Sequence, residues 1–538
     1  MIVKKILFLV WLVIFSSNVF ASTRIQEILP EFEKYIEKVQ AEWGAPGLAV
    51  GIVKDGKVVY IKGFGVREVG TTKKIDEHTV FQIASLTKNI LAHLFAKLVQ
   101  TGKINWDDQV IKYMPTFFIG DAKVTSEFTI RDLLSHRSGL PSFSCDSLWY
   151  LDFSTEEIIK GLAKIPLKNP VLSKYGYQNQ LFGVASMIAE KVTGKTIEDL
   201  FKEYFFTPLK LNDSSVGLNA IKSEKSFLGR LFGSKENNNF AYPHDDRWGA
   251  THKLELSSLI YRFPGSSGAN MSITDVSQWM IFMMNRGAYN GKIIIDDNQY
   301  SHLLTSNIDC AMKYDDAQFP GDRYKSVEYG TGHFIMKYGE GNKFINTFGH
   351  MGGFYGTRSL MTVAPEEKLG IAVLSNYGSF RVSFVPEAIY NKFMDLYLGL
   401  SKIDWSQRLR NNFLSIKKQN KMYKMAQRLQ NPKKARALTD YVGTYKNDLY
   451  GQLELKTESN ILYLIFRNKR IPLEHFNGNE FTFPGHLLSE NYCQSDVGYI
   501  DFWARNGGGL DLCAIFSLLS EGKDEGVFER SNGSEIKK

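Results

Sequence analysis

A strand, turn and strand between two helical patterns limit the fold more than any other feature of this chain. Residues 23–42 carry apolar side chains at helical spacing, and an Asp-Gly turn joins two apolar runs, residues 48–53 and 58–61. A tight turn of this kind connects antiparallel strands. Helical spacing returns over residues 85–101, and Gly102 follows as a stop signal. The order helix, hairpin, helix predicts an α+β fold in which helices flank an antiparallel sheet.

The length of 538 residues exceeds one ordinary core, so we expect several domains. Residues 1–21 are interpreted as a signal peptide, because two lysines precede an apolar run that is too short to span a bilayer. A main domain is expected over residues 22–400. Eleven Lys and Arg against one acidic residue mark residues 401–436 as a basic helical linker. Short apolar runs separated by turn signals predict a C-terminal β-barrel over residues 437–533.

A signal peptide directs the mature chain out of the cytoplasm, so we expect a periplasmic or secreted protein. Beyond residue 21 we find no apolar run of the roughly 18 residues that a membrane helix needs, so no stable membrane span is expected. Cys145, Cys310, Cys493 and Cys513 would then face an oxidising compartment. Cys493 could pair with Cys513, although four cysteines allow three connectivities.

The formal net charge of +8 is scattered outside the signal peptide and the linker. It accompanies no nucleic-acid-binding motif, so we expect no nucleic-acid partner, whereas contact with an anionic cell envelope fits the charge. No cysteine or histidine cluster has metal-ligand spacing, and we expect neither a metal nor another cofactor.

Ser85 and Lys88 stand one turn apart at the start of the helix expected over residues 85–101. The lysine can therefore reach the serine hydroxyl. A serine becomes a good nucleophile when a neighbouring base takes its proton, and a lysine needs desolvation or a nearby cation to serve as that base. The helix N-terminus suits a developing anion. The alternative is an N-cap serine with a solvated lysine, because the same spacing recurs at Ser415 and Lys418.

Two other segments carry candidate site residues. Tyr177 and Asn179 precede an apolar helical pattern, and in an extended segment they would face the same side. A tyrosine near cations can act as a base, and an asparagine amide can hold a substrate carbonyl. Further on, Gly352 and Gly353 would let a backbone approach a ligand closely along a strand edge. His350 beside them could supply a cation or a hydrogen bond, or be structural.

Two serine-containing segments are interpreted as structural. Ser135 and His136 are adjacent in a short helix, where neighbouring side chains point about 100° apart, so we do not expect them to form a catalytic pair. Residues 264–272 are expected to form a tight Gly/Ser loop before a helix that begins near residue 274. Ser266 and Ser267 would be turn formers within it.

Taken in order, Ser85-x-x-Lys88, Tyr177-x-Asn179 and His350-x-Gly352 resemble the three motifs of the serine β-lactamase and penicillin-binding superfamily. The nearest likeness is to the branch of class C β-lactamases, D,D-carboxypeptidases, D-aminopeptidases and related esterases. It covers about residues 25–400, and the C-terminal part resembles a lipocalin-like β domain appended to some members. The resemblance implies an antiparallel sheet flanked by helices, an all-helical subdomain and a small C-terminal barrel.

The resemblance also implies roles for the motif residues. Ser85 would be acylated, Lys88 and Tyr177 would share the work of the base, and Tyr177 would also activate water for deacylation. Asn179, His350 and Gly352 would bind the substrate. The backbone N–H groups of Ser85 and Gly353 would form the oxyanion hole.

One departure from the family pattern affects the expected substrate. The third motif reads His-Met-Gly where class C β-lactamases usually carry Lys-Thr-Gly, and a histidine there is similar to some D,D-peptidases and esterases of the branch. We therefore expect a serine hydrolase that cleaves D-amino-acid peptides, with small amides or esters as related substrates. An esterase or weak β-lactamase is the alternative enzyme, and a catalytically silent envelope-binding module is the alternative without catalysis.

Overall fold

The computed structural model describes residues 24–222, 239–246, 250–310, 318–378, 383–419, 429, 431–488, 497–504, 510–515 and 526–531. The chain divides into two compact units. The first unit comprises residues 1–106 and 189–413, and the second unit comprises residues 107–188 and 414–538. The predicted α+β class is confirmed, because the first unit is built on an antiparallel sheet and the second ends in a closed barrel.

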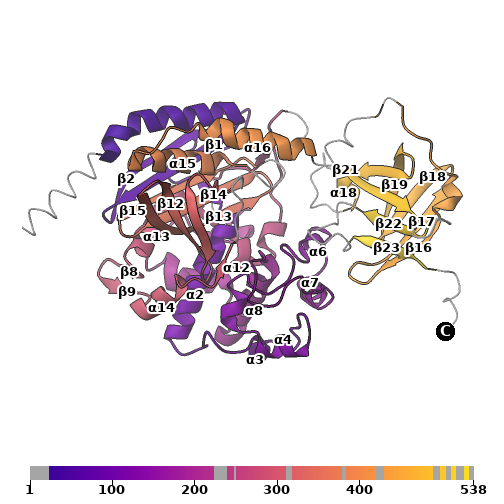
Figure 1. The fold of residues 1–538 in the computed structure, drawn as a ribbon, viewed down its shortest axis with the longest axis horizontal. Coiled ribbons are helices and arrows are strands. Elements are labelled where there is room, and N and C mark those ends of the chain that lie inside the picture. Colours follow the sequence, from indigo (N-terminus) through magenta and orange to yellow (C-terminus); the bar gives the residue numbers. More distant parts are fainter. Residues whose placement is uncertain are drawn as a thin grey trace, which may run out of the picture. The chain divides into compact units, whose positions relative to one another are not determined.

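An eight-stranded antiparallel sheet forms the centre of the first unit, in the order β10-β11-β12-β13-β14-β15-β1-β2 (Figure 1). Its strands are β1 Gly47–Lys54, β2 Lys57–Gly65, β10 Ile308–Asp309, β11 Tyr324–Tyr329, β12 Phe334–Glu340, β13 Lys343–Phe354, β14 Thr357–Ala364 and β15 Leu369–Ser375. The predicted first hairpin is confirmed as β1 and β2. Asp55 and Gly56 take φ values of 53° and 73°, which a tight hairpin turn requires.

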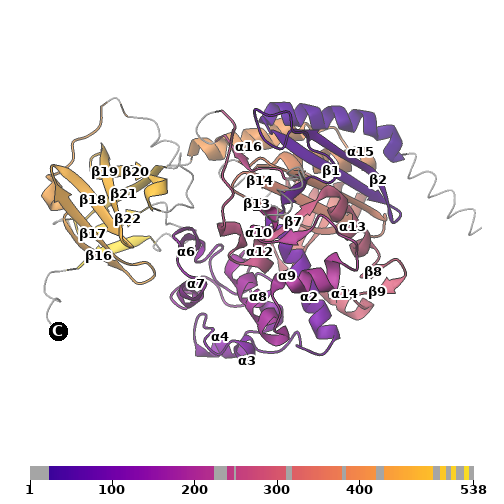
Figure 2. The same ribbon diagram turned by 180° about the vertical axis from the view of Figure 1, so that it is seen from behind.

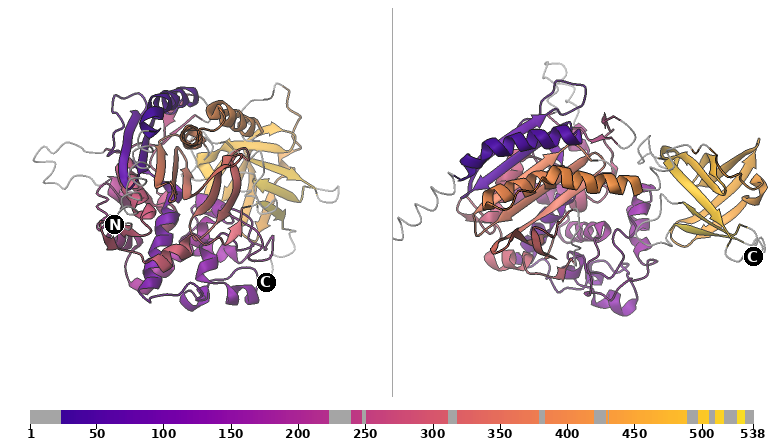
Figure 3. Two further views of the ribbon diagram at one scale, coloured as in Figure 1. Left: turned by 60° about the vertical axis from the view of Figure 1, so that its left-hand side comes forward. Right: turned by 45° about the horizontal axis from the view of Figure 1, so that its top comes forward.

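Helices cover both faces of this sheet. The helix over residues 24–43, α15 (Val385–Leu398) and the start of α16 (Trp405–Gln419) lie side by side on one face (Figure 3). The rings of Phe32 and Phe393 are 5.2 Å apart between these helices. On the other face α13 (Ile273–Met284) packs against β14, β15 and β1. The sheet is therefore buried on both sides, as its apolar strands require.

The helix predicted over residues 85–101 is confirmed as α2, Thr87–Gln100, preceded by a 3₁₀ turn, η1, Ala84–Leu86. The other short elements of the first unit are β3 Val80–Gln82, α9 Ile197–Phe201, the π-helical turn η2 Lys202–Phe206, β4 Ser215–Val216, α10 Asn219–Lys222, β5 His244–Asp245, β6 His252–Lys253, η3 Leu259–Tyr261, β8 Ala288–Tyr289, β9 Lys292–Ile293 and α14 Asp297–Leu303.

The Gly/Ser loop expected over residues 264–272 is wrong. Residues Pro264–Ser267 form a short helix, α12, beside α2, and residues Ala269–Ser272 form β7 (Figure 2). Strand β7 is the central strand of the small sheet β3-β7-β4. The sequence pattern does not distinguish a loop from this strand, because glycine and serine also suit a short buried strand that packs closely on its neighbours. The following helix begins at Ile273, where the Ser272 hydroxyl accepts from the Asp275 N–H.

The second unit contains short helices from the middle of the chain and the C-terminal barrel. The helices are α3 Val110–Tyr113, α4 Ala122–Glu127, α5 Ile130–Leu133, α6 Asp146–Tyr150, α7 Thr155–Leu162 and α8 Asn179–Thr193, whose last residues belong to the first unit. The expectation that Tyr177 and Asn179 share an extended segment is wrong for Asn179, which is the first residue of α8.

The C-terminal β-barrel is confirmed as a closed barrel of eight strands. They are β16 Gly443–Asn447, β17 Gly451–Glu458, β18 Ile461–Phe466, β19 Lys469–Asn477, β20 Glu480–Pro484, β21 Val497–Trp503, β22 Leu512–Ile515 and β23 Val527–Arg530; η4 Leu438–Asp440 precedes them and α18 Gly485–Leu488 follows β20. The sequence predicts strands over residues 442–445, 451–455, 461–466, 476–483, 498–504 and 510–516. These miss β23 and most of β19, and one of them runs across the turn at Gly478. Strand β19 was not predicted because it contains Pro472, and proline usually argues against a strand interior.

Several predictions concern residues outside the described ranges. The signal peptide, residues 1–21, is one of them. Cys493 is another. The structure has Cys513, its possible partner, as a free and buried thiol, so it does not bear out that pairing. Among the described residues, no helix combines the length and the apolar character needed to cross a membrane.

Candidate active site

The turn that carries Ser85 is held in an unusual backbone conformation. Ala84, directly before it, has φ of 47°, the left-handed region, which costs a residue with a side chain about 1–2 kcal/mol. The Thr87 hydroxyl donates to the Ala84 carbonyl oxygen at 2.7 Å, and the Ser359 hydroxyl donates to the Ile83 carbonyl oxygen at 2.8 Å. Such strain persists where the surroundings fix the backbone and is common at functional sites.

Lys88 is fully buried one turn after Ser85. Its Nζ donates to the Ser85 Oγ at 3.0 Å and to the Ser266 carbonyl oxygen at 3.1 Å. The alternative of an N-cap serine with a solvated lysine is therefore wrong. Leu86, and not Ser85, caps α2, and it does so without a side-chain hydrogen bond. A buried amine within hydrogen-bonding distance of a half-buried hydroxyl is the arrangement that serine activation needs.

Strand β13 brings its glycines against this turn. A Cβ added to Gly352 would lie 2.1 Å from the Ile83 carbonyl oxygen and 3.0 Å from the Ser85 nitrogen. Only glycine permits this approach. Strand β12 begins at Phe334, opposite Gly349, so its register with β13 ends there and residues 350–354 pair with β14 alone. The strand-edge arrangement expected from the glycines thus faces the serine turn.

His350 belongs to the same strand and is buried. Its Nδ1 is 2.5 Å from the Met351 carbonyl oxygen and therefore carries the proton, and its Nε2 is 3.0 Å from the Tyr329 hydroxyl. Desolvation and the nearby charge of Lys88 lower the pKa of His350 well below its ordinary value. Of the roles considered for this histidine, that of a cation does not fit a ring that stays neutral at physiological pH.

Tyr177 and Asn179 lie in the second unit. The Tyr177 N–H donates to the Ser142 hydroxyl at 3.1 Å, and its carbonyl oxygen accepts from the Phe143 N–H at 2.7 Å. Its ring centroid is 4.3 Å from that of His136, whose Nδ1 accepts from the Gln178 N–H. These contacts fix the backbone and the ring of Tyr177. His136 therefore supports this segment, in line with the structural role expected for it.

The amide of Asn179 is held by a carboxylate. Its Nδ2 donates to Asp146 Oδ2 at 2.9 Å, and Gln180 Nε2 donates to the other oxygen, Oδ1, at 2.8 Å. Asp146 is buried at the start of α6. The first two residues of α8 are thus fixed by one side chain.

Three residues that support the candidate site were not predicted from the sequence. Ser266 acts through its backbone carbonyl, which no side-chain pattern reveals, while the expectation for it concerned its hydroxyl. Ser359 and Asp146 belong to no motif, and each meets its partner only in the folded chain. Asp146 lies 33 residues before Asn179 in the chain, and no sequence pattern singles it out.

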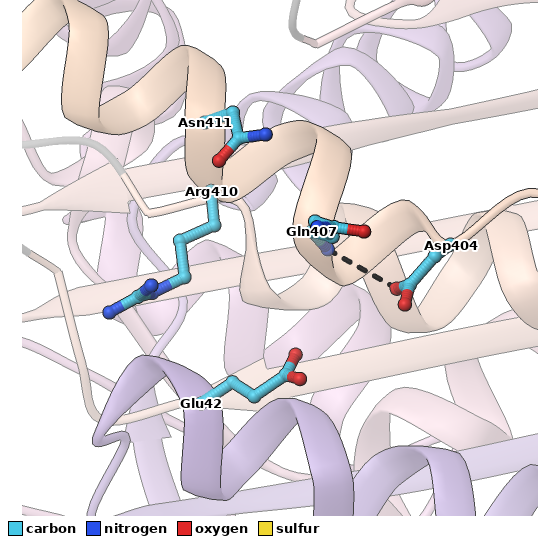
Figure 4. Close-up of a pocket in the computed structure, with 5 residues that line it drawn as sticks. All are labelled: Glu42, Asp404, Gln407, Arg410 and Asn411. Atoms are coloured by element: carbon cyan, nitrogen blue, oxygen red, sulfur yellow. Dashed lines mark hydrogen bonds between the residues drawn. The ribbon is translucent and has the colours of Figure 1, made fainter.

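A polar pocket of about 470 Å³ lies elsewhere in the first unit, between the helix over residues 24–43 and α16 (Figure 4). Its lining residues are Glu42, Asp404, Gln407, Arg410 and Asn411. Both carboxylates already have partners: Glu42 accepts from the Ser406 hydroxyl at 2.5 Å, and Asp404 accepts from Lys38 at 2.5 Å. The pocket therefore offers no activated nucleophile. Within the described ranges, no three histidine, cysteine or carboxylate side chains are grouped to hold a metal ion.

Comparison with known proteins gives a consistent picture. A family model described as Beta-lactamase matches residues 32–391. The chain is similar to the unguisins hydrolase ungD of Aspergillus violaceofuscus, with 23% identity over 79% of this chain and 76% of that protein.

Two solved structures share the fold. One is the octameric penicillin-binding protein homologue from Pyrococcus abyssi, with a TM-score of 0.56, 20% identity and coverage of 93% of this chain and 100% of that one. The other is the D-amino acid amidase from Ochrobactrum anthropi SV3, with a TM-score of 0.52, 20% identity and coverage of 69% and 98%.

Proposed function

Because the chain belongs to the beta-lactamase family, we propose that it is a serine hydrolase that forms a covalent acyl-enzyme on Ser85. The observation that carries this proposal is the fully buried Lys88, whose Nζ lies 3.0 Å from the Ser85 Oγ and is anchored by the Ser266 carbonyl. A buried lysine placed on a serine hydroxyl has a chemical use that a structural lysine on the surface lacks.

In the proposed reaction the Ser85 Oγ attacks the substrate carbonyl carbon, and its proton passes to Lys88 and Tyr177, which act jointly. The N–H groups of Ser85 and Gly353 stabilise the oxyanion, each by about 3–4 kcal/mol. The leaving group takes the proton as the acyl-enzyme forms. Tyr177 then activates the water that releases the acid. Asn179 orients the substrate amide, and Gly352 lets the strand backbone approach it.

This mechanism requires the Tyr177 segment to complete the site around Ser85, and we propose that it does. The fixed ring of Tyr177 and the fixed amide of Asn179 support this role, because catalytic groups gain from being held before the substrate arrives.

For the substrate we propose a peptide or amide bond next to a D-amino acid. The likeness to a D-amino acid amidase and to a penicillin-binding protein homologue supports this class. The signal-peptide pattern of residues 1–21 supports a periplasmic or secreted location, where the chain would meet peptides of the cell envelope.

A second candidate is an esterase or weak β-lactamase, and the state of His350 favours its esterase form. A lysine in the third motif would bring a positive charge, whereas the lowered pKa of the buried His350 leaves that position neutral. A neutral group attracts a substrate carboxylate less than a positive charge does, whereas esters and amides without a carboxylate lose little from the missing charge. Cleavage that releases a C-terminal amino acid is therefore the form of peptidase activity that we expect to be weakest.

The test is labelling of the full chain with a fluorophosphonate probe and, in parallel, with a labelled penicillin, each followed by peptide mapping. An adduct on Ser85 that is absent from Ser85→Ala supports the hydrolase. A chain without an adduct and without hydrolysis of any substrate would instead be a silent envelope-binding module. Rates on a D-Ala-D-Ala peptide, a D-amino-acid amide, a short-chain ester and a cephalosporin then rank the substrate classes.

A further inference from the structure

The second unit contains a contact between its two parts, the helices α6 and α7 and the barrel. The turn over residues 448–450, between β16 and β17, carries Tyr450, whose hydroxyl forms a hydrogen bond with the hydroxyl of Ser147 in α6. A Cβ added to Gly161 of α7 would lie 3.1 Å from Leu449 Cδ1, so this helix also touches the turn. Tyr450 and Ser147 are both buried, which places their hydrogen bond out of water.

This turn is shaped before it reaches the helices. The Asn447 side-chain oxygen accepts from the N–H groups of Leu449 and Tyr450 at 2.8 and 2.9 Å. An asparagine that bonds its own downstream backbone in this way stabilises a turn. On the helical side, Lys164 Nζ donates to the Asp448 carbonyl oxygen at 2.6 Å. The turn is therefore held from within and by Lys164, two residues after the end of α7.

A second turn of the barrel, residues 467–468 between β18 and β19, makes an independent contact. The Arg467 guanidinium carbon lies 3.7 Å from the centroid of the Phe153 ring, and its Nη1 is 3.7 Å from Glu157 Oε1 in α7. Arg467 and Asn468 have φ of 46° and 65°. Asparagine and glycine usually fill such a turn, so an arginine there needs a compensating contact, and Phe153 and Glu157 supply it.

Helix α6 connects these contacts to the Tyr-x-Asn segment. Ser147, which bonds Tyr450, directly follows Asp146, which holds the amides of Asn179 and Gln180. A carboxylate that accepts two amide donors while buried fixes both firmly. A displacement of α6 would move Asp146 and release Asn179.

We propose that the C-terminal barrel, through Tyr450 and Arg467, holds α6 and α7 in the place from which Asp146 orients Asn179. Asp146 is then a positioning residue, and the barrel is part of the working hydrolase. This inference rests on the proposed function of Asn179, but the contact itself can be measured without catalysis.

The decisive variant of the full chain is Tyr450→Phe/Arg467→Ala, which removes the hydroxyl and the guanidinium while leaving the strands intact. The matched control is Arg470→Ala. The Arg470 guanidinium lies 3.9 Å from the Tyr463 ring and pairs with Glu458, so its contacts stay inside the barrel.

Hydrogen exchange supplies the readout that is independent of activity. In the double variant we expect the amides of α6, α7 and residues 176–180 to exchange about tenfold faster, and kcat to fall by a similar factor with KM little changed. Asp146→Ala should lower kcat more than Asp146→Asn, which keeps one acceptor oxygen. Arg470→Ala should change none of these quantities.

Each contrary outcome overturns a stated part of the inference. Unchanged exchange in α6 and α7 would exclude the docking contact. Faster exchange there, with unchanged kcat in an active enzyme, would exclude the positioning role. If the wild-type chain neither takes the probe nor hydrolyses a substrate, the proposed function fails. Exchange that spreads from α6 to residues 176–180 would then still support the coupling, and exchange confined to α6 and α7 would overturn it.

Discussion

A Cβ added to Gly352 would lie 2.1 Å from the carbonyl oxygen of Ile83 and 3.0 Å from the nitrogen of Ser85. Both neighbours are backbone atoms, so Gly352→Ala must push strand β13 and the serine turn apart. A displacement of about 1 Å at a catalytic nucleophile lowers the rate about a hundredfold. We expect acylation of Ser85 by a fluorophosphonate probe to slow by that order, and the thermal unfolding temperature to fall.

Gly51→Ala is the control for this substitution. Its added Cβ would lie 2.5 Å from Ser277 Oγ and 3.0 Å from Ile273 Cγ1, a clash with side chains of α13, which packs on the sheet away from the serine turn. This variant should lose stability while its folded fraction acylates at the wild-type rate. Equal slowing in both variants would show that general loosening of the sheet, and not displacement of the turn, limits acylation.

Lys88→Met tests the proposed base. Methionine fills much of the same buried space but cannot take a proton, and it leaves the Ser266 carbonyl without its donor. Loss of a general base slows the chemical step by about 10² to 10⁴-fold. We expect the rate constant for acylation, followed by intact-protein mass spectrometry, to fall within that range.

Lys97→Met is the matched control in the same helix. Lys97 Nζ donates to the Ile294 carbonyl oxygen at 2.7 Å. This substitution therefore also removes an α2 lysine that donates to a backbone carbonyl. Acylation should stay near the wild-type rate. If Lys88→Met also acylates at that rate, Tyr177 takes the proton by itself and the joint role assigned to Lys88 is wrong.

The sequence could predict the parts of the site that depend on local geometry. Ser85 and Lys88 meet because residues three apart on a helical turn share a side, and Gly352 signals a close approach because it lacks a side chain. The partners from distant segments could not be predicted in this way. The Ser266 carbonyl lies 178 residues from Lys88 along the chain, and it is a group that every residue carries.

The same distinction applies to the fold. The first hairpin was predictable, because two apolar runs and the Asp-Gly turn between them each point to it. Strand β19 was not, because Pro472 interrupts its pattern, yet the strand pairs Pro472 with Tyr463 in the barrel. The neighbours of a strand decide whether a missing N–H is tolerated, and a single sequence does not show those neighbours.

His333 should make the free energy of unfolding depend on pH. Burial lowers the pKa of His333 to about 4, whereas the unfolded chain titrates near 6.5. Between these values the unfolded state binds a proton that the native state does not. The contribution of His333 to the free energy of unfolding is therefore full above pH 6.5 and falls by about 1.4 kcal/mol per pH unit on acidification towards 4.

Urea unfolding of the wild type and of His333→Gln at several values between pH 6.5 and 4.5 measures this contribution. The variant should lose less free energy of unfolding than the wild type as the pH falls. His475→Gln, at an exposed position of the barrel, is the control and should follow the wild-type curve. Parallel curves for the wild type and His333→Gln would show that His333 takes up its proton in the native state as readily as in the unfolded chain.

Arg358 and Glu387 form a buried ion pair next to the strand that carries the third motif. Arg358 lies opposite Gly353 in the β13 and β14 register, and its Nε donates to Glu387 Oε1 at 3.0 Å, with side-chain exposures of 11% and 2%. Glu387→Leu leaves a buried guanidinium without its carboxylate, so we expect a loss of about 3–5 kcal/mol in the free energy of unfolding. Arg358→Met/Glu387→Leu removes both charges and should regain most of that loss. Chemical unfolding of the two single variants and the double variant closes the cycle, and additive losses would mean that the pair is not coupled.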